Sequence, residues 1–92
     1  MIGIDGDQGA ALRKIHRAAH LDRLARLQRE GRLILAGPFS DGSGSLIVLS
    51  APSLAQAELF AKEDPYVTGG VFKSVEVKPF KQIFPAEDFT SP

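Results

Sequence analysis

Two residues in this sequence, His20 and Asp64, have side chains suited to moving a proton. A carboxylate beside an imidazole fixes its tautomer, orients the ring and stabilises the imidazolium form. Such a histidine can accept or donate a proton near neutral pH. Each residue also has a purely structural interpretation. His20 could be a core histidine bonded to a backbone carbonyl, and Asp64, which precedes Pro65, could be a turn residue.

Three further residues bear on ligand binding near His20. Arg17 lies about one helical turn before it and could hold an anionic group. Ser45 ends a stretch of glycines and serines whose backbone N–H groups could meet a polar ligand, although a hairpin loop explains that stretch better. His16 precedes His20 by four residues, a spacing that two metal-binding imidazoles can use. No third ligand is evident and no cofactor motif occurs, so we expect neither a metal ion nor a cofactor.

Composition limits the classes of partner. The chain has 92 residues, enough for one domain with a modest core, and its lack of cysteine suggests a reducing compartment. Eleven basic residues balance eleven acidic ones, so we expect no binding to nucleic acid or to anionic membranes. The arginines of the first helical region have no interleaved aromatics, which indicates a solvated face. No apolar run reaches membrane-spanning length and no signal-peptide pattern opens the chain, so a cytoplasmic location is expected.

The first helix positions His20. Residues 11–30 have a helical composition, without glycine or proline. Their apolar side chains fall on two stripes displaced from each other, which predicts a start turn or kink before a main helix over residues 17–30, ended by Gly31. His20 falls inside the apolar stripe of that main helix. We therefore expect it to face the protein interior or the lip of a cleft.

The other elements follow from alternation and helical spacing. A second helix is expected over residues 54–63 and should stop before the Asp64-Pro65 dipeptide. The expected strands are a short one at residues 2–4, then 33–37, 45–50 and 71–78, with Phe80, Ile83 and Phe84 as a short fifth strand. We assign residues 1–84 to one domain and residues 85–92 to a C-terminal tail.

This order of elements predicts a ferredoxin-like α+β fold of βαββαβ type. Both helices would lie on one face of the sheet, so His20 and Asp64 could approach each other. The second and third strands are nevertheless apolar on both faces, as residues 33–36 and 46–49 show. A single chain would expose a large apolar patch. We therefore expect a homodimer that packs sheet against sheet.

Several stretches of the chain resemble the YciI-like (YCII-related) family. They are Asp64-Pro65-Tyr66-Val67, Gly70-Val71-Phe72, residues 75–84 (VEVKPFKQIF), Ala19-His20-Leu21 with Leu24, and Gly31-Arg32-Leu33 through Ala36-Gly37-Pro38. The resemblance extends from about residue 17 to residue 84. It departs from the family at Ala18, where proline is usual, and at Gly3, where bulkier apolar residues are common.

The resemblance implies a dimeric α+β barrel of ferredoxin-like subunits, with an active site on a His–Asp pair that matches His20 and Asp64. One relative is similar to a dehydrochlorinase that removes HCl from a chlorinated hydroxyquinol. We therefore expect a lyase- or isomerase-type acid–base enzyme acting on a small organic molecule, with Arg17 and Ser45 holding a polar substrate. The alternative is a non-catalytic dimeric module that binds a small molecule or serves another enzyme.

Overall fold

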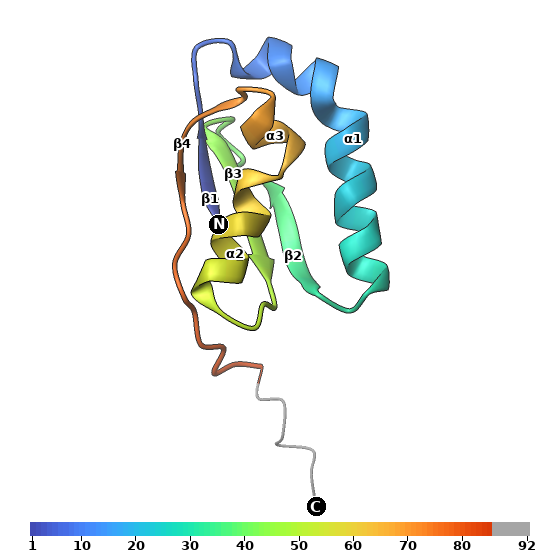
Figure 1. The fold of residues 1–92 in the computed structure, drawn as a ribbon. Coiled ribbons are helices and arrows are strands. Elements are labelled where there is room, and N and C mark those ends of the chain that lie inside the picture. The colour runs from blue at the N-terminus through green and yellow to red at the C-terminus, as the bar shows by residue number, and fades with distance from the viewer. Residues whose placement is uncertain (86–92) are drawn as a thin grey trace, which may run out of the picture.

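The computed structural model describes residues 1–85, which form a four-stranded antiparallel sheet with helices packed on it (Figure 1). The predicted βαββαβ order is confirmed, with one addition, a short helix before the last strand. The elements are β1 (Ile2–Asp5), α1 (Gly9–Arg29), β2 (Leu33–Pro38), β3 (Gly44–Leu49), α2 (Leu54–Lys62), α3 (Pro65–Thr68) and β4 (Phe72–Glu76).

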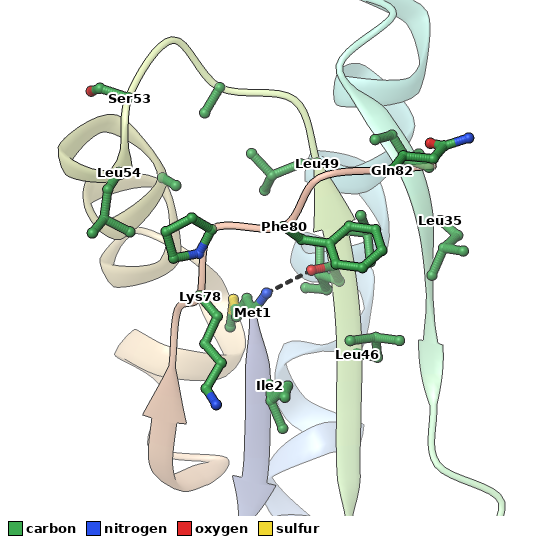
Figure 2. Close-up of a pocket in the computed structure, with 16 residues that line it drawn as sticks. Met1, Ile2, Leu35, Leu46, Leu49, Ser53, Leu54, Lys78, Phe80 and Gln82 are labelled. Atoms are coloured by element: carbon green, nitrogen blue, oxygen red, sulfur yellow. Dashed lines mark hydrogen bonds between the residues drawn. The ribbon is translucent and has the colours of Figure 1, made fainter. Parts of the chain in front are cut away.

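The sheet has the strand order β2-β3-β1-β4, which is the ferredoxin-like order. The first strand therefore lies in the middle, where Gly3 pairs with Ser45 on one side and Val75 on the other. Figure 2 looks onto the sheet face that points away from α1, and α1 lies behind the strands in that view. One sheet face is thus covered by helices and the other is open.

Helix α1 is one continuous helix of 21 residues, longer than predicted at its start. Its first turns run in a different direction from the rest (Figure 1). The two apolar stripes do not both pack on the sheet, since Ile15 of the first is 70% exposed and Leu21 of the second is 53% exposed. The helix ends as predicted at Gly31, whose φ of 73° only glycine adopts readily. The N–H of Gly31 donates to Gln28 and that of Arg32 to Leu27, both at 3.0 Å, which satisfies the last carbonyls of the helix.

Two glycines set how closely the strands and core approach each other. A Cβ on Gly44 would overlap the carbonyl oxygen of Gly3 in the neighbouring strand. A Cβ on Gly3 would lie 2.6 Å from the ring of Phe72, which belongs to the main core cluster with Tyr66 and Val71. Bulkier residues are common in the family at the position of Gly3. Here the ring of Phe72 fills the space that such a side chain would occupy.

The predicted fifth strand is wrong, because residues 77–85 form no strand. Phe80, Ile83 and Phe84 are 78%, 59% and 83% exposed, so they do not join the core of this chain. Pro79 has no N–H to offer a ladder at the point where the strand would have to continue. This segment instead turns across the open sheet face, where Phe80 lies over β3 (Figure 2). The predicted tail lies almost wholly outside the described residues.

The open face of the sheet is apolar, as predicted. It forms part of a groove of about 690 Å³ that Leu35, Leu46 and Val48 line together with Phe80. Ile34 and Leu35 are each about half exposed there, at 52% and 51%. A single chain therefore leaves large apolar side chains uncovered on this face.

Candidate functional site

His20 lies in the middle of α1 and is only 6% exposed, so it faces inward as its helical phase predicted. Its Nδ1 lies 2.9 Å from Oδ1 of Asp64. Because a carboxylate accepts hydrogen bonds, Nδ1 carries the hydrogen. The other ring nitrogen, Nε2, takes no part in this contact. Within residues 1–85, every side-chain nitrogen or oxygen that is fully buried has a hydrogen-bond partner. Nε2 of His20 has no partner in that part of the chain, so it is not fully buried. Nε2 therefore reaches the solvent.

Asp64 is 2% exposed and caps the short helix α3. Its Oδ1 accepts the backbone N–H of Tyr66 at 2.8 Å as well as the imidazole of His20. Pro65 occupies the first position of α3, where a missing N–H costs no helical hydrogen bond. The sequence interpretation placed Asp64 at the end of α2 and missed α3. The hydrogen bond from the backbone of α3 holds the Asp64 carboxylate in place, in addition to its contact with His20.

Arg23 places a positive charge beside the second oxygen of this carboxylate, with Nη1 3.6 Å from Oδ2 of Asp64. The guanidinium also donates from Nη2 to the carbonyl of Phe60 at 2.7 Å and lies 4.2 Å from the centre of that ring. Burial lowers the pKa of Arg23, while the charge of Asp64 raises it. Arg23 thus belongs to the support of the His–Asp pair, a role that the interpretation of the helical arginines as a solvated face did not predict.

Tyr66 holds the plane of the imidazole. Its ring stacks on His20 with the ring centres 3.7 Å apart and the planes 8° from parallel. It also meets Phe72 edge to face at 5.9 Å. His20 is therefore fixed by a hydrogen bond at one nitrogen and by a stacked ring across its face. From the sequence, Tyr66 was expected as part of the family motif and as a candidate apolar wall of the cleft, but its stacking on His20 was not predicted.

A second charged pair lies on the same side of the sheet. Arg13 donates from Nε and Nη2 to the two oxygens of Asp5 at 2.7 and 2.8 Å, and from Nη2 to Oγ of Ser45 at 2.9 Å. The hydrogen bonds that Arg13 donates to Asp5 raise the pKa of Arg13, and nearby Tyr66 acts in the same direction. The expectation that Arg13 is solvated is wrong, since its side chain is 15% exposed. Asp5 and Arg13 are eight residues apart, and the sequence holds no local signal for their contact.

Several of these residues line a cleft of about 410 Å³ between α1 and the strands β2 and β3, with Tyr66 of α3 at its edge. His20, Arg17 and Ser45, all predicted from the sequence, line it. Arg17 is exposed at the rim, whereas Ser45 is 5% exposed. The remaining lining residues are Arg13, Leu21, Leu24, Ala36, Gly37, Pro38, Ile47 and Tyr66. The structure thus brings together the four predicted site residues, with Asp64 behind His20, and adds Arg13 and Tyr66.

His16 does not line this cleft and instead lies against Gly69, where a Cβ would collide with the imidazole. Across residues 1–85, no group of three or more histidines, cysteines or carboxylates is close enough to hold a metal ion. In the same part of the chain, none of the helices has the length and apolar character needed to span a membrane.

The fold and the site together define a class: small ferredoxin-like α+β proteins with a buried histidine–aspartate pair at the wall of a cleft. The chain belongs to the YCII-related domain family, whose domain it matches over residues 1–81. It is 42% identical to Protein YciI of Escherichia coli O6:H1 over 78 residues, which cover 74% of this chain and 80% of that protein. It is 40% identical, with the same coverage, to an uncharacterised protein of Haemophilus influenzae.

A solved structure extends the comparison to an enzyme. The chain is similar to 5-chloro-2-hydroxyhydroquinone dehydrochlorinase (TftG) of Burkholderia phenoliruptrix AC1100, solved in complex with 2,5-dihydroxybenzoquinone. The TM-score is 0.76 and the identity 25%, over 87% of this chain and 89% of TftG. The structural neighbour is thus an enzyme, whereas the relatives closer in sequence carry no assigned reaction in their names.

Proposed function

We propose that the cleft is an active site in which His20 transfers a proton and Asp64 orients it. The observation that carries this proposal is the buried 2.9 Å contact between His20 Nδ1 and Asp64, which leaves Nε2 as the nitrogen open to a ligand. A carboxylate in this position stabilises the imidazolium that forms when Nε2 accepts a proton. The stacked ring of Tyr66 restricts rotation of the imidazole, so the proton acceptor is held in one direction.

The reaction is an elimination or isomerisation on a small organic molecule, of lyase or isomerase type. The likeness to TftG, a dehydrochlorinase, supports elimination. When HCl is eliminated, a base removes a proton, the electron pair of that bond forms a new double bond, and chloride leaves with the electron pair of its bond to carbon. His20 is the base in this scheme: Nε2 takes the proton and later releases it to water.

Chloride release from 5-chloro-2-hydroxyhydroquinone tests this proposal. General acid–base catalysis contributes about 10²- to 10⁴-fold to a rate, so His20→Gln should lower turnover by a factor in that range. His16→Gln is the matched control, because it removes an imidazole from the same helix outside the cleft. Turnover by the His20→Gln protein at the wild-type rate would refute the role of His20.

The alternative function, a module that binds a small molecule without converting it, predicts a different result. Wild-type protein would then bind 2,5-dihydroxybenzoquinone, measured by calorimetry or thermal shift, but would release no chloride from the chlorinated compound. It would also convert none of a panel of small aromatic and hydroxy-acid ligands that stabilise it against heat. Asp64→Asn separates the two functions further, since an enzyme loses turnover with little change in ligand affinity.

We also propose that two chains pair through the open sheet face. Apolar residues of β2 and β3 line the groove there, and Phe80 crosses it while 78% exposed (Figure 2). Covering such side chains is favourable by about 25 cal/mol per Å² of apolar surface. Leu46→Lys should therefore shift the mass measured by light scattering toward that of one chain, 9.9 kDa. Leu59→Lys, an exposed leucine of α2 outside the groove, is the control. Wild-type protein that is already monomeric at micromolar concentration contradicts the proposal.

A further inference from the structure

The cleft is lined by two arginines and, within residues 1–85, by no carboxylate. Among its lining residues, all within the described part of the chain, are the guanidinium groups of Arg13 and Arg17, but no aspartate or glutamate. The carboxylates of Asp5 and Asp64 do not line the cleft: Asp5 is bound by Arg13, and Asp64 is bound by His20 and a backbone N–H. A ligand entering the cleft therefore meets cations first.

Arg13 is held as a fixed cation. Its Nε and Nη2 bind the two oxygens of Asp5 as a fork, and Nη2 also reaches Oγ of Ser45. Gly9 makes room for this arrangement, because a Cβ there would lie 2.6 Å from the Asp5 carboxylate. None of these contacts uses Nη1 of Arg13. A guanidinium locked in this way loses little conformational freedom when its remaining N–H groups bind a ligand oxygen.

Arg13 and His20 stand on the same side of α1. They are seven residues apart, which is about two helical turns and about 10 Å along the axis. Both contact the ring of Tyr66: the guanidinium of Arg13 lies 5.1 Å from its centre and the imidazole of His20 stacks on it at 3.7 Å. A small planar molecule can therefore present one end to Arg13 while its other end reaches His20.

We propose that Arg13 binds a negatively charged oxygen of the ligand, a carboxylate or an ionised ring hydroxyl, and that the cleft selects small planar organic anions. Asp5 is the positioning residue that holds Arg13 in place. Arg17, which makes no ion pair within residues 1–85, adds attraction at the rim. This inference rests on the proposed function for what happens at His20, but anion binding itself is measured without turnover.

Calorimetry with wild-type protein gives the first test. The probes are 2,5-dihydroxybenzoquinone, which is anionic at neutral pH, its uncharged dimethyl ether, and the pair benzoate and benzamide. A charge-assisted hydrogen bond to Arg13 should make each anion bind about ten- to a hundredfold tighter than its neutral counterpart. Equal affinity within each pair, or no binding of either anion at millimolar concentration, overturns the proposal.

Variants of α1 give the second test. Arg13→Gln should weaken binding of the anionic probe by the same factor, whereas Arg29→Gln removes the same charge from the exposed end of the helix and should not change it. Arg17→Gln should weaken it a fewfold, and this exposed variant keeps the test available if Arg13→Gln does not fold. His20→Gln should retain anion binding. Equal effects of the Arg13 and Arg29 variants refute the proposal, while intact anion binding without chloride release leaves it standing and rejects the proposed reaction instead.

Discussion

Replacing Asp64 tests the support of the site in a way that separates stability from catalysis. Asp64→Ala removes the cap of α3, which typically contributes about 1 kcal/mol. It also leaves the buried Nδ1–H of His20 without an acceptor, at a cost of about 1–3 kcal/mol, and takes the carboxylate from beside Arg23. The expected loss in the free energy of unfolding is therefore about 2–5 kcal/mol, close to the usual cost of breaking a buried ion pair.

Asp64→Asn should cost less than Asp64→Ala by at least about 1 kcal/mol, because asparagine caps helices about as well as aspartate. Its neutral amide cannot stabilise an imidazolium at His20, so turnover should fall about as far as in the alanine variant. Stability is measured by urea unfolding followed by circular dichroism, at one protein concentration because self-association shifts the midpoint. Asp22→Ala on the exposed face of α1 is the control and should change stability by less than about 0.5 kcal/mol. An Asp64→Ala protein as stable as this control would show that the buried pair does not hold the site together.

Two further substitutions and one titration test the fold outside the His–Asp pair. Gly3→Ala places a Cβ 2.6 Å from an aromatic ring and should destabilise the protein by about 1–3 kcal/mol in thermal unfolding, whereas Gly37→Ala meets nothing within 4 Å and should be neutral or slightly stabilising. Ser53→Ala removes the side chain that accepts the N–H of Gln56 at the start of α2 and should cost about 1 kcal/mol by the same measurement. Hydrogen bonds from Ser43 lower the pKa of Asp41 below its ordinary value of 3.8, so its contribution to stability is present above pH 3.8 and is lost as the pH falls through the lowered pKa. A carboxyl-carbon NMR titration of Asp41 with a midpoint at or above 3.8 would contradict this.

The sequence predicted the two partners of the proton-transferring pair for different reasons. Helical phase predicted that His20 turns inward, and His20 is one of the three buried residues of α1, with Gly9 and Leu27. Asp64 was interpreted as a helix end, although it is in fact a helix start. The signal for α3 was present, since aspartate followed by proline is a typical N-cap and first helical position, but a four-residue helix gives no periodicity that confirms it.

The support of the site was not predictable in the same way. Arg13 and Arg23 look like ordinary solvated arginines in a helical sequence, and nothing local distinguishes them from Arg29. Their partners are Asp5 in β1 and the carbonyl of Phe60 in α2, which only the packed fold brings close. Long-range contacts of this kind follow from the topology, not from spacing along the chain.

Strand β3 contributes side chains both to the cleft, where we propose anion binding, and to the open face, where we propose that two chains pair. The two proposals can therefore be tested separately. Successive side chains of a strand point to opposite faces. Ser45 accordingly lines the cleft under α1, whereas Leu46 and Val48 line the groove on the open face. Leu46→Lys should therefore change the mass of the assembly without changing the affinity for an anion, and substitutions at the cleft should do the reverse. If Leu46→Lys weakens anion binding as strongly as Arg13→Gln does, the cleft is complete only in the dimer, and the proposed pairing would be part of the site.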